Sequence, residues 1–360
     1  MSAHEILIYI MAAFAVLGAL DRILGNRVGL GKEFEEGILA MGSLALAMLG
    51  IISLAPVLAS ILRPVVVPVY SFLGADPAMF AGTILACDMG GASLAKELTA
   101  DPQAALLGGV IGGSMLGATI VFTIPVAIGI LRPEDRPAMA KGILAGIVTI
   151  PVGIFVGGLI AGFPIIKVLR NLIPIVLIAA LIALGLWKAE KWMIRGFGIF
   201  GKGIIALITV GLAAAIVERL TGFALIPGMA SIEGGFLTVG EIAIVLAGAF
   251  PLVWAVTRLL RKPLLRVGKW LGINDTAAGG LIATLANSIA TFGMVKEMDD
   301  RGKVVNIAFA VSAAFVFGDH LGFTAGFAPE MLTAMIAGKL AGGISAIFVA
   351  LFLTKKKAGG

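Results

Sequence analysis

The sequence contains few of the residues on which metal, redox and disulfide chemistry depends. Cys87 is the only cysteine among 360 residues, and His4 and His320 are the only histidines. A single cysteine excludes an intramolecular disulfide, and so few soft ligands give no reason to expect a metal or a redox cofactor. The chain also has no P-loop, so ATP-driven pumping by this protein alone is not expected. No metal, cofactor or catalytic residue is therefore predicted.

Charged residues are scarce as well, at 13% of the chain, whereas 59% of the residues are hydrophobic and the mean hydropathy is +1.08. These values lie outside the range of soluble domains and predict an all-α polytopic membrane protein that contacts membrane lipid. The 49 glycines fit close helix packing in lipid. Because Met1–Glu5 lacks a basic residue, the first apolar run is predicted to be a retained span and not a signal peptide.

Eleven apolar stretches follow one another along the chain. They cover residues 5–21, 38–62, 78–95, 104–131, 142–164, 168–187, 199–217, 236–260, 276–295, 304–327 and 331–353. Pairs of residues recur about 200 positions apart: Asp21-Arg22 as Glu218-Arg219, Glu35 as Glu233, and Lys96-Glu97 as Lys296-Glu297. Such collinear matches predict two five-element repeats, residues 1–164 and 199–354, with a linking span at 165–198 and a cytoplasmic tail at 355–360.

The positions of the basic residues indicate how the repeats lie in the membrane. If all eleven segments crossed, the 27 Lys and Arg residues would divide 13 inside to 14 outside. If the third and ninth segments instead return to the side they left, 21 lie inside and 6 outside, with an external N-terminus, which agrees with the excess of positive charge in cytoplasmic loops. Basic residues placed in this way orient spans, so the net charge of +6 does not indicate nucleic-acid binding.

With re-entrant or broken third and ninth segments, the second repeat is inverted relative to the first. Inverted repeats whose interrupted segments meet near the midplane are typical of secondary transporters. Eleven plain spans with unusual charge placement remain the alternative.

The tip of the first re-entrant segment carries the run from Ala86 to Gly91, which includes Cys87 and Asp88. A carboxylate at membrane depth is expensive, so Asp88 is a candidate binding residue; the alternative is an acid that caps a half-helix or pairs with a lysine. The repeat places Asn287 opposite Asp88. Cys87 either lines the same cavity or is a small buried residue.

The tenth segment carries Asp319 and His320 between Gly318 and Gly322, at positions that are uncharged in the first repeat. An acid beside a titratable imidazole could bind a cation or relay a proton. The alternative is a solvated helix end at the outer interface. Phe122 and Phe323 lie near these polar positions and could supply a cation-π face, unless they only pack in the core.

Several longer motifs occur in one order from the first span to the last, and the chain resembles the bacterial ethanolamine utilisation permease family through them. The motifs are Glu35-Glu36-Gly37, Ala55-Pro56-Val57-Leu58-Ala59, Phe80-Ala81-Gly82-Thr83, Ala86-Cys87-Asp88-Met89-Gly90-Gly91, Leu144-Ala145-Gly146-Ile147-Val148-Thr149-Ile150-Pro151 and Gly318-Asp319-His320-Leu321-Gly322-Phe323. The resemblance implies uptake of ethanolamine across the bacterial cytoplasmic (inner) membrane. The loops around 163–168 and 223–236 look shorter than in that family.

Ethanolamine is mostly a cation at neutral pH, because the pKa of an alkyl amine lies well above 7. Asp88 or Asp319 could accept the ammonium, and the hydroxyl could bond to one of five polar side chains: Thr119, Thr123, Asn287, Ser288 or Thr291. An ion-coupled transporter of another small cation and an intramembrane enzyme that uses Asp88 with Asp319 are the competing functions. A homo-oligomer is left open.

Overall fold

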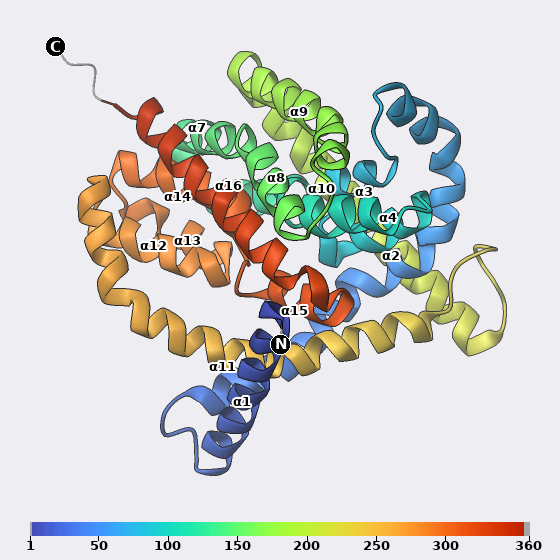
Figure 1. Ribbon diagram of the computed structural model, residues 1–360, viewed down its shortest axis with the longest axis horizontal. Coiled ribbons are helices and arrows are strands. Elements are labelled where there is room, and N and C mark those ends of the chain that lie inside the picture. The colour runs from blue at the N-terminus through green and yellow to red at the C-terminus, as the bar shows by residue number, and fades with distance from the viewer. Residues whose placement is uncertain (1, 356–360) are drawn as a thin grey trace.

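The computed structural model describes residues 2–355, without the side chains of residues 260–262 and 264, and every regular element in this part of the chain is helical (Figure 1). The first half contains α1 (Ala3–Ile23), α2 (Leu30–Phe72), α3 (Ala78–Ile84), α4 (Gly91–Leu98), α5 (Pro102–Ala105), α6 (Ile124–Ile130), α7 (Arg136–Ile147) and α8 (Ile150–Ile160). Two π-helical stretches, Leu106–Gly117 and Thr119–Thr123, connect α5 to α6. The rest contains α9 (Ile165–Lys188), α10 (Glu190–Thr221), α11 (Ile232–Leu271), α12 (Asp275–Ala286), α13 (Ser288–Met294), α14 (Asp300–Ala313), α15 (Asp319–Phe327) and α16 (Leu332–Leu353).

The helices follow the eleven predicted apolar stretches in order. Eight helical segments are long and apolar enough to cross a membrane, which confirms the polytopic helical class. The three stretches outside this set are interrupted: residues 78–95 and 276–295 are the helix pairs α3/α4 and α12/α13, and residues 304–327 divide into α14 and α15. The predicted cytoplasmic tail lies beyond the described residues, apart from Lys355.

The two long helices α2 and α11 cross in close contact at glycine residues. A Cβ atom added to Gly37 would lie 2.6 Å from Cα of Ala247, and one added to Gly235 would lie 2.7 Å from Leu49. Gly235 is the repeat equivalent of Gly37, and Ala247 is the equivalent of Leu49, since both pairs are 198 positions apart. Exchanging the two repeats therefore turns the Gly37–Ala247 contact into the Gly235–Leu49 contact. An early residue of each helix meets a later residue of the other, so the helices run antiparallel where they cross.

The outer helices of the two repeats show the same exchange. A Cβ atom on Gly50 of α2 would lie 1.9 Å from the carbonyl oxygen of Ile208 on α10. A Cβ atom on Gly248 of α11 would lie 2.3 Å from the carbonyl oxygen of Met11 on α1. Only glycine allows such close approach of two helix backbones. Contacts that map onto themselves when two units are exchanged are what a two-fold relation between the predicted repeats requires.

Ion pairs repeat in the same way, because Arg22 pairs with Glu35 and Arg219 pairs with Glu233. These are the residues whose recurrence predicted the repeat. All four side chains are about half exposed, so each pair contributes little to stability. The pairs join equivalent helices within each repeat. Inversion of the second repeat across the bilayer remains a prediction.

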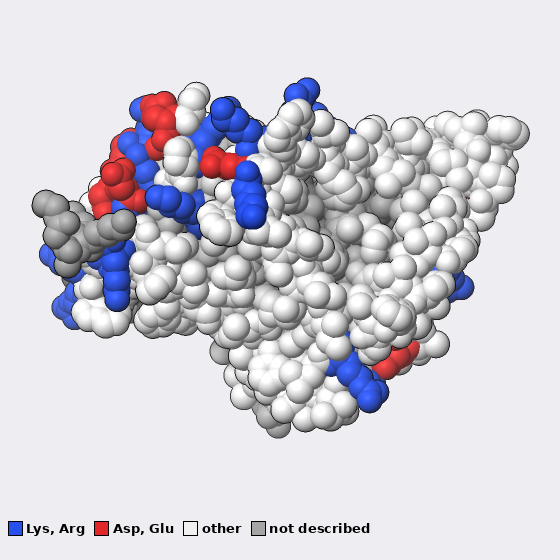
Figure 2. All heavy atoms as spheres, turned by 90° about the horizontal axis from the view of Figure 1, so that it is seen from above, with Lys and Arg blue, Asp and Glu red and all other residues white. Residues whose placement is uncertain are grey.

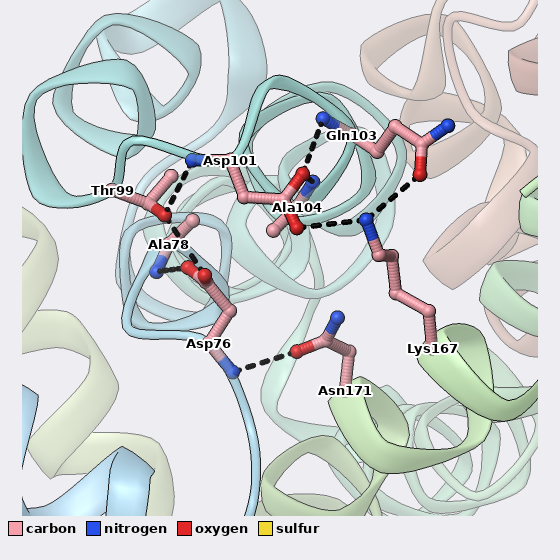
Figure 3. A network of polar contacts seen from close by, with 8 residues as sticks. All are labelled: Asp76, Ala78, Thr99, Asp101, Gln103, Ala104, Lys167 and Asn171. Atoms are coloured by element: carbon pink, nitrogen blue, oxygen red, sulfur yellow. Dashed lines mark hydrogen bonds and ion pairs between the residues drawn. The ribbon is translucent and has the colours of Figure 1, made fainter.

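The two ends of the first helix hairpin, α3/α4, meet in the polar network of Figure 3. The Thr99 hydroxyl donates to Asp76 Oδ2 at 2.8 Å, and the Asp76 backbone N–H donates to Asn171 Oδ1 at 2.7 Å. Lys167 on α9 donates to Asp101 Oδ2 at 2.8 Å. Burial acts to raise the pKa of Asp101, but hydrogen bonds from Lys167 and the α5 backbone outweigh it, so this pKa is lowered. A segment that crossed the membrane between Asp76 and Thr99 would separate these partners.

The second hairpin, α12/α13, closes at equivalent positions. The Asn274 backbone N–H donates to Asp299 Oδ1 at 2.8 Å, and its side-chain amide donates to the Glu297 carbonyl at 2.9 Å. Lys303 forms an ion pair with the buried Asp135 at 2.7 Å. In an arrangement of eleven crossings, Asp135 and Lys303 would lie on opposite faces of the membrane. Both hairpins therefore return to the end at which they begin.

On the face that Figure 2 shows, charged side chains gather mainly toward one end, and broad parts of the surface carry none. Such bare surface suits contact with lipid. One basic residue departs from this distribution: Lys339, which the charge count placed among the six outer residues, is fully buried in the middle of α16. The count is wrong for Lys339 because it treated every lysine and arginine as a loop residue.

The contacts predict the accessibility of two exposed residues, Ala100 and Pro133. Cysteine at Ala100, just after the first hairpin, should react with a membrane-impermeant thiol reagent from outside intact cells. Cysteine at Pro133 should react with this reagent only after the cells are permeabilised, so that the reagent reaches the cytoplasmic side. The native Cys87 is fully buried and gives little background. The opposite pattern at both positions would require the eleven-crossing arrangement.

Candidate binding site

The tenth segment is unwound between α14 and α15, and the second hairpin satisfies its backbone. Phe315 has a positive φ of 63°, which is uncommon for a residue with a side chain. Its N–H donates to the Thr284 carbonyl at 3.2 Å, and the Phe317 N–H donates to the Leu285 carbonyl at 2.9 Å. Non-helical backbone at membrane depth needs such partners, because lipid offers none.

The turn of the first hairpin, between α3 and α4, is held by glycine. Gly90 has φ +87°, and a Cβ atom there would lie 2.1 Å from the Ile51 side chain. The Gly91 N–H donates to the Ala86 carbonyl at 2.9 Å and closes the turn. This local geometry presents Cys87 and Asp88 at the break between the two half-helices.

The two breaks meet around a small cavity of about 40 Å³. Asp88 comes from the first hairpin, Phe122 from the π-helical segment, and Asp319 with His320 from the start of α15. The other lining residues are Ala86, Met89, Ala118 and Phe315. The structure thus brings together four of the predicted site residues from three segments.

The polar groups of this cavity have unused hydrogen-bonding capacity. His320 Nε2 lies 3.7 Å from Asp88 Oδ1, which is too long for a hydrogen bond. Asp88 Oδ1 and His320 Nδ1 are buried, and neither has a hydrogen-bond partner among the described residues. Ligand atoms of Cys87, Asp88 and His320 lie within 4.8 Å of one another. The cavity therefore offers a carboxylate oxygen and an imidazole nitrogen to a small polar ligand.

Lys339 is the charged neighbour that the sequence reasoning missed. Its side chain is 1% exposed, and its ammonium donates to the Ser114 carbonyl of the π-helical segment. It is close enough to Asp88 for an electrostatic interaction, as is Asp319. The signal in the sequence was a lone lysine in the middle of the apolar stretch 331–353.

Aromatic rings form one wall of the cavity. Phe122 and Phe315 pack edge to face with ring centroids 5.3 Å apart, and Phe315 lies 5.4 Å from the His320 ring. Ring faces of this kind can interact with a cation. Phe323 does not line the cavity; it is buried and stacks on Phe327 at 5.0 Å, in agreement with the core-packing alternative.

The five side chains considered for a substrate hydroxyl lie outside the cavity lining. The Thr119 hydroxyl lies 2.7 Å from the Met115 carbonyl and 2.8 Å from the Val311 carbonyl and can donate its one proton to either. Thr291 donates to the Gly280 carbonyl, so both threonines serve helix packing. Thr123 and Ser288 are buried elsewhere.

Asn287 is at the tip of the second hairpin, as the repeat predicted, but it does not face Asp88. Its exposed side chain accepts a hydrogen bond from the Ile289 N–H at 2.7 Å and caps α13.

Known proteins are similar in sequence to this chain over almost its whole length. A family profile described as "Ethanolamine utilisation protein, EutH" matches residues 3–353. The chain belongs to this family.

Within the EutH family, a protein of Listeria monocytogenes named "Probable ethanolamine permease EutH" is 59% identical, over 99% of this chain and 95% of the relative. The Salmonella typhimurium protein of the same name is 50% identical, over 99% of this chain and 97% of its own length. A Bacillus subtilis relative, "Uncharacterized protein YxeR", is 52% identical over 98% of this chain and 96% of its own length. No solved structure matches the chain.

Because Lys339 and Asp88 are buried charges of opposite sign in this site, we predict that the contribution of each to the stability of the protein depends on the presence of the other. Lys339→Met should lower the stability of the protein in detergent by about 1.5–3 kcal/mol, because it removes a buried cation beside the carboxylates and the hydrogen bond that its ammonium donates to the Ser114 carbonyl. Asp88→Asn in the Lys339→Met background should restore part of the loss. Thermal unfolding of the two single variants and the double variant measures this coupling.

Lys296→Met, which removes an exposed lysine, is the matched control and should change stability little. A double variant whose loss of stability equals the sum of the two single losses would show that the two groups are energetically independent.

Proposed function

We propose that this protein is an ethanolamine permease that takes up protonated ethanolamine across the bacterial cytoplasmic membrane, by facilitated or secondary transport. Membership of the EutH family supports the proposal, as do the names of its relatives. The observation that carries it is the buried Asp88 oxygen, without a hydrogen-bond partner among the described residues, in a cavity where two interrupted segments meet. Such a place in the membrane is where secondary transporters bind substrate.

The size and chemistry of the cavity suit a small ammonium ion. A water molecule needs roughly 10–15 Å³ of cavity volume, so a cavity of 40 Å³ holds only a compact ligand. A primary ammonium has three donors for Asp88 and Asp319, and Phe122 with Phe315 offers ring faces to the charge. His320 is the polar group in the lining that remains for the substrate hydroxyl.

Charge balance favours a monovalent cation. With both carboxylates ionised, Asp88, Asp319 and Lys339 together carry one negative charge. Protonated ethanolamine brings the sum to zero, which lowers the cost of enclosing these groups away from water. A divalent metal ion would leave the site positive, and a neutral solute would leave it negative.

A role in transport explains the presence of Asp88 and Asp319 in the cavity better than a role in catalysis does. The EutH relatives carry permease names. Uptake of labelled ethanolamine into proteoliposomes with recovery of the unchanged amine tests this distinction.

Asp88→Asn should weaken ethanolamine binding by roughly tenfold to a hundredfold while folding is spared. A charge-assisted hydrogen bond contributes on the order of 1.5–3 kcal/mol, and the substitution keeps the shape of the side chain. Binding to purified protein and uptake into proteoliposomes measure the effect.

Glu36→Gln, which removes an exposed acid from α2, is the control and should bind like the parent protein. Unchanged affinity for ethanolamine in a well-folded Asp88→Asn protein would contradict the assignment of Asp88 and would indicate that Asp319 binds the ammonium.

Choline should compete with ethanolamine much more weakly than unlabelled ethanolamine does. Its three N-methyl groups remove every donor that the carboxylates use, and they enlarge the cation beyond so small a cavity. Competition in the uptake assay measures the preference. Equal inhibition by the two compounds would mean that the aromatic wall, and not a carboxylate, recognises the cation.

A further inference from the structure

A second cleft, separate from the binding site, lies between the α6–α7 connection and α10. Its volume is about 1090 Å³. Four basic residues and one acid line it together with apolar side chains. The basic residues are Arg136, Lys191, Arg195 and Lys202, the acid is Glu190, and the apolar residues include Pro125, Ile128, Ile194, Ile199 and Ile205.

Three of the basic residues lie on one face of α10. Lys191, Arg195 and Lys202 are spaced by four and seven residues, which places them along a single stripe of a helix. All three are exposed, as is Arg136 across the cleft. No salt bridge involves any of the four within the described part of the chain, so the cleft carries a net positive charge even with Glu190 included.

The length of α10 places these charges at the membrane surface. Its 32 residues extend about 48 Å, whereas the hydrocarbon core of a bilayer is about 30 Å thick. Residues 203–221, which follow Lys202, extend about 29 Å and are enough to cross this core. We therefore place the basic end of α10 beyond the hydrocarbon, on the side that the charge distribution predicts to be cytoplasmic. Trp187 in the last turn of α9 and Trp192 at the start of α10 are both 74% exposed, and exposed tryptophan is typical of the interfacial layer.

Glycine keeps the cleft open. A Cβ atom added to Gly129 or Gly198 would have no neighbour within 4 Å. At Gly201, by contrast, an added Cβ atom would lie 2.8 Å from the Pro125 ring, so α6 and α10 are in close contact at the base of the cleft. The result is a cleft with a rim of basic side chains and walls of apolar ones, among which Ile199 and Ile205 are more than half exposed.

We propose that this cleft binds an anionic phospholipid. The phosphate lies among Arg136, Lys191, Arg195 and Lys202, and an acyl chain lies along the isoleucines of α6 and α10. Basic pockets between helices on the cytoplasmic side are suited to acidic headgroups, and arginine binds phosphate through two parallel hydrogen bonds. A soluble anion would use the rim alone, whereas a lipid uses both the rim and the apolar walls. The proposal does not rest on the transported substrate.

The test measures binding of phosphatidylglycerol to the purified full-length protein by native mass spectrometry, with phosphatidylcholine of the same chains for comparison. The parent protein should retain phosphatidylglycerol preferentially. Arg195→Gln with Lys202→Gln should weaken its binding by roughly tenfold to thirtyfold, since each charge near the surface contributes about 1 kcal/mol. Gly198→Leu, which fills the cleft without changing its charge, should also weaken binding.

The matched control is Arg266→Gln with Lys269→Gln, which removes two exposed charges from α11, outside the cleft. This control should bind lipid like the parent protein. Equal losses in the two double variants would overturn the proposal in favour of general surface charge. Normal binding in Gly198→Leu would place the lipid outside the cleft, and equal competition by millimolar inorganic phosphate would identify an anion site without a lipid component.

Discussion

The site depends on the requirement that backbone polar groups inside a membrane find partners within the protein. The unwound stretch between α14 and α15 exists because the end of α12 accepts hydrogen bonds from Phe315 and Phe317. The turn after α3 exists because Gly90 and Gly91 close it locally. The unwound stretch and the turn lie next to each other in the fold, and the cavity is the space between them. The chemistry of Asp88 and Asp319 follows from that geometry.

Much of the fold could be predicted from spacing alone. Residues that recur about 200 positions apart, such as Arg22 and Arg219, make equivalent ion pairs, and contacts at Asp76 and Asn274 join the two ends of each hairpin, as the predicted returns of the third and ninth segments require. Charge placement could find the returns because a re-entrant segment changes the side of every later loop. The same reasoning could not find Lys339, because a count of loop charges assumes that no lysine is buried.

The site could be predicted only in part, because spacing fixes where a residue lies along the chain and not where its side chain points. Asp88, Asp319 and His320 come together, since each lies at an interruption. Asn287 also lies at an interruption, yet its side chain caps α13. Thr119 and Thr291 bond to carbonyls of neighbouring helices, as hydroxyls in lipid commonly do. Phe315 was missed because its role depends on a backbone break that apolar composition does not reveal.

The contacts of the long helices repeat in the two halves of the chain, whereas the charges do not. Contacts between α2 and α11 exchange with the repeats, but Asp319 and His320 align with uncharged Ala118 and Thr119, and Asp88 aligns with a neutral asparagine. The cavity therefore takes one acid from the first repeat and one from the second. Under the proposed function, a cation held between them would contact both predicted repeats at once, and its free energy of binding would depend on their relative position. A change in that position between two states of the protein would change the affinity for the cation, which is the coupling that alternating access requires.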